Sequence, residues 1–466
     1  MVFSSLMFLF VYFPVVLGIY YISPLRWRNL FLLLANLVFY GWGEPVYILI
    51  MFLSIFIDYT HGLLVEKYRD NDKKARAFVV SSMVFNLALL FFFKYYDFLA
   101  DSLRALPLFS FLPRLNVPLP IGISFYTFQT MSYTVDVYRG EARAQKSIVN
   151  FGTFVTLFPQ LIAGPILQYR DLDEQLTGRR HSAEKFASGA RIFTIGLAKK
   201  VLLANNIGML WDVYKATPAS ALTVGGAWLG IIAFAFQIYF DFSGYSDMAA
   251  GLGRMLGFEF MRNFNYPYIS RSITEFWRRW HISLGSWFKN YLYIPLGGNR
   301  RGKARQYFNI LVVWAATGIW HGASWNFLVW GLYFCLLLVI EKAFLLKWLE
   351  HAPRALSHLY ALFFILIGWA IFALEDMNAM GAYLSAMFGL NGGGLFGAAD
   401  RYALTNYAAM LPVLAAASTP LGARLFGRIP ERMAQVLVPL LMLVGLVLST
   451  AYLVDATYNP FLYFRF

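Results

Sequence analysis

The sequence has few charged residues and almost no cysteine. Only 14% of its 466 residues are charged and 59% are hydrophobic, whereas a typical soluble domain carries about 25% charged residues. This shortage of charge excludes an ordinary soluble enzyme. Cys335 is the one cysteine, so an internal disulfide is excluded, and a single thiol does not make a metal site. We expect Cys335 to be a small buried residue, and we expect neither a bound metal nor a tightly bound cofactor.

Long apolar runs fill most of the chain. Runs of roughly 18 to 22 residues are long enough to cross a hydrocarbon core of about 30 Å. A β-barrel is excluded because its strands would break about every ten residues. The pattern predicts an all-α, polytopic membrane protein with about ten crossings. They are expected at roughly 3–22, 28–42, 46–65, 78–98, 120–137, 188–209, 223–248, 356–374, 403–420 and 434–454.

The formal net charge of +14 has a membrane explanation. The basic residues lie in short loops between apolar runs, where the positive-inside rule and anionic lipid headgroups account for them. Nucleic acid is therefore not an expected partner, but membrane lipids are. If the basic loops are cytoplasmic, ten crossings place both termini outside. No basic residue precedes the first run and no small-x-small cleavage site follows it, so we expect it to be a retained helix and not a signal peptide.

Three apolar segments do not fit as crossings. The segment 149–168 has basic loops at both ends, and it contains Pro159 and Pro165, which break a straight helix. The segment 282–296 is short and polar in places. The pair 308–322 and 325–341 consists of two arms of about 15 residues, so it is expected to bend before the far surface, with His321 at the bend. These segments predict re-entrant helices.

His321 lies in the stretch "TGIWHGASWNFLVWG", at residues 317–331. A packed histidine can donate to a carbonyl and do nothing else. However, ionisable residues at membrane depth are expensive, and they usually line a cavity or pathway. This argument favours a functional role for His321.

Several motifs together resemble one known family. They are "FWRRWHISLGSWFKNYLYIPLGG", "GIWHGASWNFLVWG", "FQTMSYTVDVYRG" (128–140), "FPQLIAGPI" (158–166), "YFDFSGYSDMAAGLG" (239–253) and the ending "YNPFLYFRF". Their combination resembles the membrane-bound O-acyltransferase family, and most of all its bacterial branch that O-acetylates extracytoplasmic polysaccharides such as alginate.

The resemblance implies a single domain over 1–466, with helices around a central tunnel. Its motif core would be 237–331, and 455–466 would be an extracytoplasmic tail. The resemblance also implies a bacterial inner membrane protein that uses acetyl-CoA as donor and a polysaccharide as acceptor. The expected partner is an extracytoplasmic acetyltransferase related to SGNH hydrolases. Peptidoglycan O-acetylation, teichoic acid D-alanylation, lipid acylation and transport without chemistry remain as alternatives.

The same resemblance implies that His321 is catalytic and that His281 is a second functional histidine. An imidazole can take a proton from an acceptor hydroxyl and return it to a thiolate. A covalent role for Ser324 or Cys335 is the alternative. For His281 three roles stay open: shaping the donor entrance, polarising the thioester, or structural pairing with Glu275 or Asp247.

Two further sites are predicted, one beside His281 at the cytoplasmic edge and one in the C-terminal tail. Arg278 and Arg279 suit the phosphates of coenzyme A, although the positive-inside rule explains them equally well. In the tail, Tyr463 is either an aromatic interface anchor or, by resemblance to the small membrane peptide of teichoic acid D-alanylation, an acyl carrier.

Overall fold

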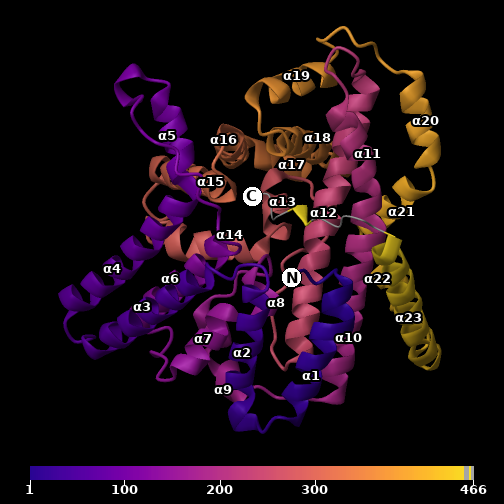
Figure 1. Cartoon of the computed structure of the whole chain (residues 1–466). Coiled ribbons are helices and arrows are strands. Elements are labelled where there is room, and N and C mark those ends of the chain that lie inside the picture. The colour runs from indigo at the N-terminus through magenta and orange to yellow at the C-terminus, as the bar shows by residue number, and fades with distance from the viewer. Residues whose placement is uncertain (456–460, 463–466) are drawn as a thin grey trace. The chain divides into compact units, whose positions relative to one another are not determined.

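A computed structural model describes residues 1–455, 461 and 462, and over this range the chain is helical without a β-strand (Figure 1). The prediction of an all-α protein is therefore confirmed. The chain forms two compact units, which we call the first unit (1–193 with 245–261) and the second unit (194–244 with 262–466). The long helix α12 (Val224–Met255) contributes to both.

The first unit contains the N-terminal helices and a buried polar cluster. Its helices are α1 (Phe13–Ile22), α2 (Arg28–Gly41), α3 (Ile48–Lys67), α4 (Asp72–Leu90), α5 (Tyr96–Arg104), α6 (Ile123–Arg139), α7 (Ile148–Thr156), α8 (Phe158–Leu161), α9 (Tyr169–Gly178) and most of α10 (Ala183–Ala198). On α3, the buried carboxylate of Asp58 accepts a hydrogen bond from the Ser82 hydroxyl at 2.6 Å. The side-chain amide nitrogen of Asn86 donates to both carboxylate oxygens of Asp58, at 3.0 and 2.8 Å. Because buried polar groups must be paired, this cluster fixes how α3 and α4 pack.

The expected break in the segment 149–168 is confirmed. Helix α7 ends at Thr156, Leu157 is extended with ψ 105°, and Pro159 lies at the start of α8. Gly164 then packs where a side chain would not fit, because an added Cβ would lie 2.5 Å from the Cα of Gln160. The whole stretch from Phe151 to Tyr169 is buried, so protein covers its irregular backbone as a membrane requires.

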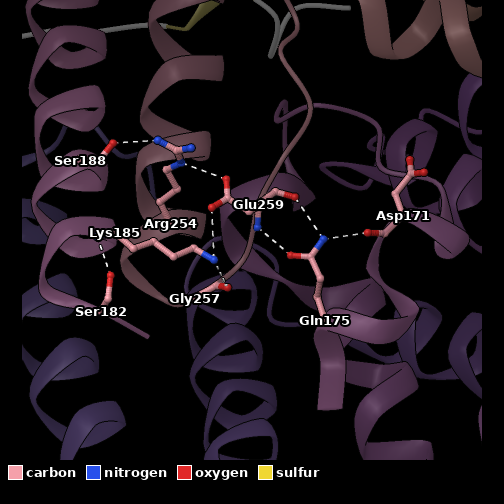
Figure 2. Close-up of polar contacts among 8 residues, drawn as sticks. All are labelled: Asp171, Gln175, Ser182, Lys185, Ser188, Arg254, Gly257 and Glu259. Atoms are coloured by element: carbon pink, nitrogen blue, oxygen red, sulfur yellow. Dashed lines mark hydrogen bonds and ion pairs between the residues drawn. The ribbon is translucent and has the colours of Figure 1, made fainter. Parts of the chain in front are cut away.

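Charged and polar side chains hold the loop that follows α12 in the first unit (Figure 2). Arg254 donates to Glu259 at 3.0 Å and to Ser188 at 2.7 Å. Lys185 lies 3.2 Å from Glu259, and Gln175 exchanges hydrogen bonds with the Glu259 backbone. The loop leads to Asn263, four residues after Glu259, so the chain is anchored shortly before the site described below.

The second unit contains the remaining helices. They are α11 (Asn205–Ala216), α13 (Ile273–Arg279), α14 (Ile282–Phe288), α15 (Lys303–His321), α16 (Trp325–Ile340), α17 (Leu346–His351), α18 (Arg354–Ala373), α19 (Met377–Met387), α20 (Ala398–Asn406), α21 (Met410–Ala417), α22 (Leu421–Phe426) and α23 (Glu431–Asp455). Helix α23 exposes large apolar side chains along its length, including Val436 at 71% and Leu443 at 58%. Such a surface is stable against lipid and costly in water.

Six described helices are long and apolar enough to cross a membrane. They are 48–67, 72–104, 224–255, 325–351, 354–373 and 431–455. Five of them coincide with expected crossings, and the chain is a multi-pass membrane protein. Some of the other expected crossings fall on shorter helices, such as α2 with 14 residues and α6 with 17. The expected crossing 188–209 falls on α10, a π-helical turn and α11, which follow one another without a break.

The two helices on either side of His321 are longer than the expected arms of about 15 residues, so this prediction is wrong. Helix α15 has 19 residues, and the helix that starts at Trp325 continues for 27 residues to His351. The second arm continues through Glu341, which is fully buried and accepts hydrogen bonds from the backbone N–H groups of Ile273 and Thr274 at 2.6 and 2.8 Å. Glu341, the last residue of the expected second arm, therefore binds the first two backbone N–H groups of α13.

Candidate active site

The helices α15 and α16 form a tightly packed hairpin, and its glycines make the close approach possible. A Cβ added to Gly318 would lie 2.4 Å from the carbonyl oxygen of Phe327, and one added to Gly331 would lie 2.4 Å from that of Trp314. Small residues let membrane helices pack backbone to backbone. This explains the glycine spacing of the motif at 317–331.

His321 is the last residue of α15 and is 5% exposed. Its Nδ1 lies 2.7 Å from the carbonyl oxygen of Thr317, one turn earlier. Because a carbonyl only accepts, Nδ1 carries the proton and Nε2 of the neutral ring carries the lone pair. The rings of Trp330 and Phe372 pack edge-on against the imidazole, at 4.8 and 5.6 Å between ring centres. The result is an oriented base in an aromatic shell.

The turn after His321 also depends on a glycine. Gly322 is extended, and a Cβ added there would lie 2.2 Å from the ring of Phe327. The chain therefore folds back onto α16 directly after His321, and the imidazole is held at the end of a rigid hairpin.

His281 connects α13 and α14 in a left-handed conformation, with φ 45° and ψ 53°. A residue other than glycine rarely adopts this conformation, and strained residues cluster at functional sites. Its Nδ1 lies 3.3 Å from the side-chain oxygen of Asn263, which also accepts from the backbone N–H and hydroxyl of Ser283. The oxygen assignment of Asn263 follows from that N–H, so Nδ1 of His281 is the donor.

The structural pairing of His281 with Glu275 that the sequence left open is not what the structure shows. Glu275 bonds to Arg279 instead, and Asn263 takes its place. His281 lies outside the six apolar helices, and burial, together with the nearby His321, holds its pKa well below the usual 6.5. A neutral ring protonated at Nδ1 presents a lone pair at Nε2.

Both histidines line the same cavity. It has a volume of about 190 Å³, and its walls are mostly aromatic, with Trp277, Trp280 and Trp314 among them. A cavity of this size accepts a short acyl group beside the two imidazoles, and its apolar walls keep water away from a reacting thioester. The structure thus brings together the two histidines that the sequence singled out.

The two arginines predicted to bind donor phosphates have different surroundings. Arg279 donates to Glu275 at 2.9 Å and to the backbone oxygen of Asn265 at 3.1 Å. Arg278 lines a polar hollow of about 630 Å³ together with Arg271 and Arg354. Helix α13 therefore turns Trp277 to the histidine cavity and Arg278 to a polar hollow in which three arginines lie beside Glu275 and Glu350.

Ser324 and Cys335 do not line the cavity. Ser324 caps the start of α16, with its hydroxyl 3.4 Å from the backbone oxygen of Glu375, and Cys335 is buried in the same helix. Neither is among the residues that surround the two imidazoles. Tyr463 lies outside the described residues. Within those residues, no group of histidine, cysteine and acidic side chains is arranged to hold a metal ion.

Sequence reasoning missed Asn263, which holds the turn at His281 with both its side chain and its backbone. Its carbonyl oxygen accepts from the N–H of Ile282 at 2.9 Å. The only signal was a pair of asparagines, Asn263 and Asn265, in the otherwise aromatic and basic stretch "RNFNYPY".

These features define a helical membrane protein with two oriented imidazoles that line one mostly apolar cavity. Residues 37–372 match the sequence profile of MBOAT, the membrane-bound O-acyltransferase family. The chain belongs to this family and is an O-acyltransferase.

Named relatives agree with this assignment. A probable alginate O-acetylase AlgI of Azotobacter vinelandii is 44% identical over 391 residues, which cover 83% of this chain and 78% of that protein. A probable alginate O-acetylase AlgI of Pseudomonas putida is 40% identical over 489 residues, covering 100% of both chains. A peptidoglycan O-acetyltransferase of Helicobacter pylori is 33% identical over 433 residues, with 84% of this chain and 80% of that protein covered.

Proposed function

We propose that this protein takes an acetyl group from acetyl-CoA in the cytoplasm and delivers it for O-acetylation of an extracytoplasmic polysaccharide of the alginate type. The main support for this proposal is the cavity that His321 and His281 both line. The Nδ1 proton of His321 is donated to the Thr317 carbonyl oxygen, which orients the ring. The names of the relatives at 40 and 44% identity support acetyl as the group and alginate as the polymer.

In the proposed reaction His321 is the general base. Its Nε2 removes the proton of an acceptor hydroxyl while the hydroxyl oxygen attacks the thioester carbon. The carbon–sulfur bond breaks, an oxygen ester forms, and the proton passes from Nε2 to the leaving thiolate. A positioned base of this kind contributes about 10²- to 10⁴-fold to the rate. The exclusion of water protects the thioester from hydrolysis.

His281 has a different proposed role. With its proton on Nδ1 and directed at Asn263, its Nε2 accepts hydrogen bonds and cannot donate one to a thioester oxygen. This tautomer disfavours polarisation of the thioester. We assign His281 to holding the donor arm, by accepting a hydrogen bond from an amide N–H of coenzyme A where that arm enters the cavity.

The donor phosphates are proposed to lie at Arg278. Arg278, Arg271 and Arg354 make no ion pair within the described part of the chain, and arginine forks match phosphate oxygens. Arg279 has its partners within the protein and is proposed to hold α13 in place. This assignment separates two neighbours that the sequence treated alike.

On the far side of the membrane, Tyr463 is the proposed acyl carrier. A phenol has a pKa near 10, so its ester has a better leaving group than a sugar ester, and onward transfer is downhill. An extracytoplasmic acetyltransferase related to SGNH hydrolases would then pass the acetyl group to the polymer. The proposal includes the inner membrane as location and both termini outside.

The test is acetyl transfer in proteoliposomes loaded with radiolabelled acetyl-CoA, with partner and polymer outside. His321→Ala should lower transfer by at least about 100-fold, while His351→Ala, at an exposed residue bonded only to the Lys347 backbone, should leave it intact. Near-normal transfer by His321→Ala would overturn the mechanism. Peptidoglycan strands serve as the second acceptor, since the Helicobacter pylori relative carries that name.

A further inference from the structure

A buried ion pair lies in the second unit, and neither of its residues lines the histidine cavity. Lys200 is on a π-helical turn (Lys199–Ala204) and Asp241 is on α12, and their side chains are 3% and 2% exposed. The Nζ atom lies 2.5 Å from Oδ1 of Asp241 and also donates to Asn205 at 2.9 Å. Moving two ions out of water is expensive, and a buried pair is weak evidence for stability. Stability alone therefore does not account for the burial of these two charges.

The second carboxylate oxygen of Asp241 binds a backbone group of the C-terminal tail. Its Oδ2 accepts a hydrogen bond from the backbone N–H of Leu462 at 2.9 Å. Phe461, the residue before, is 2% exposed. In Figure 1 this short yellow piece lies beside α12, among the helices of its own unit. The tail is therefore seated in the protein at these two residues.

We propose that Asp241 is a positioning residue that docks the C-terminal tail, and that Lys200 keeps its carboxylate charged for that purpose. A hydrogen bond to an ionised acceptor is about twice as strong as a neutral one. The bond is made to the backbone, while burial of Phe461 adds an apolar anchor. A carrier group tethered next to a fixed anchor reaches its site at a high effective concentration. In this last respect the inference rests on the proposed role of Tyr463.

The plain alternative is an ion pair that only joins α12 to the helix carrying Lys200. Two substitutions at one position separate the readings. Leu462→Pro removes the N–H and leaves Lys200 and Asp241 untouched, whereas Leu462→Ala keeps the N–H and shortens the side chain. Both changes leave the buried Phe461 side chain in place and alter a residue outside every described helix, so we expect the fold to tolerate them.

The measurement is the rate at which a carboxypeptidase removes the tail in detergent, followed by mass spectrometry. Leu462→Pro should release the tail about ten-fold faster or more, the loss expected for a hydrogen bond to a charged group. Leu462→Ala should stay within about three-fold of the unmodified protein. Equal release from the two variants overturns the proposal.

A second pair of variants tests Asp241 itself. Lys200→Leu with Asp241→Leu removes both charges and the acceptor, and such apolar replacement of a buried pair is often neutral for stability. Lys200→Gln with Asp241→Asn removes both charges but keeps an acceptor oxygen. We expect fast release from the first double variant. The second should release the tail at a rate between that of the first and that of the unmodified protein, because its acceptor is neutral. The reverse order, or the same rate in both, contradicts docking by Asp241.

The release assay needs no catalysis, so its result is independent of the proposed reaction. His321→Ala should keep a protected tail even if transfer is lost. If Leu462→Pro frees the tail and polymer acetylation is nevertheless normal, docking stands and the carrier role of Tyr463 falls.

Discussion

The side-chain oxygen of Asn263 lies 3.3 Å from Nδ1 of His281 and also accepts two hydrogen bonds from Ser283, at 2.9 and 3.1 Å. One amide oxygen thus sets the tautomer of the histidine and closes the turn on which it stands. A left-handed residue persists only where its surroundings over-determine it, and Asn263 supplies that constraint.

Asn263→Ala should therefore lower acetyl transfer about as much as His281→Ala does. Loss of a positioning bond of 1 to 2 kcal/mol corresponds to about a ten-fold lower rate. The double variant should transfer acetyl no more slowly than the slower of the two single variants, because the two residues act as one unit. The measurement is transfer from acetyl-CoA with kcat and KM determined separately.

Asn265→Ala is the matched control for this experiment. Asn265 uses only its backbone, in an exchange of hydrogen bonds with Arg279, so its side chain can be removed with an effect near that of an ordinary surface change. Additive losses in the Asn263 and His281 variants would show that the two side chains act separately.

Gly322→Ala should destabilise the folded protein. The new Cβ would lie 2.2 Å from the ring of Phe327, and overpacking of this kind costs about 1 to 3 kcal/mol. The measurement is the thermal midpoint in detergent, read by fluorescence-detected gel filtration. Gly381→Ala, in α19 with open space around the glycine, should not lower the midpoint, since alanine favours a helix.

A second variant tests whether the contact between the new Cβ and the Phe327 ring causes the loss of stability. Phe327→Ala added to Gly322→Ala should recover part of the lost midpoint, because it removes the ring that the new methyl group meets. If Gly322→Ala is as stable as the unmodified protein, the hairpin is looser than its contacts indicate.

The sequence predicted the class of fold and both histidines because these depend on local signals, namely run length and motif. It could not predict the partners of His281, since Asn263 is an ordinary loop residue until the chain turns back on it. Glu341 seemed to end an apolar run, and only the packing of α13 against it shows why the helix continues. Lys200 lies inside the expected crossing 188–209, and its pairing with Asp241 joins residues 41 positions apart, which no local signal in the sequence indicates.

A pH-dependent contribution to stability is expected from Glu259. Burial raises the pKa of this carboxyl, but hydrogen bonds from Arg254 and Lys185 outweigh burial and hold the pKa below its ordinary value of 4.5. A lowered folded-state pKa adds stability at pH values above 4.5, and that stability is lost as the pH falls through the folded-state value. Glu259→Gln should therefore be less stable than the unmodified protein at pH 7, with the difference shrinking below pH 4.5.

The size of this effect is limited by solvent. The Glu259 side chain is 47% exposed, so the difference at pH 7 should be below about 1 kcal/mol. Thermal midpoints of the two proteins at pH 7 and at pH 4 give the comparison. Glu174→Gln, at an exposed residue of α9 without an ion pair in the described structure, is the control. A difference that grows on acidification would contradict the assigned role.

The orientation in the membrane can be tested with single cysteines at exposed loop positions. Asp70 lies in a basic loop and Lys303 is the exposed first residue of α15, next to another basic loop; the positive-inside rule places both in the cytoplasm. Leu390, 79% exposed, lies in the loop after α19. Cys335 is 6% exposed, so the native thiol contributes little background. In intact cells an impermeant maleimide should label Leu390→Cys only, and Asp70→Cys and Lys303→Cys should react after the inner membrane is opened. If Asp70→Cys and Lys303→Cys react in intact cells and Leu390→Cys does not, the orientation is reversed, and with it the side from which acetyl-CoA reaches His281.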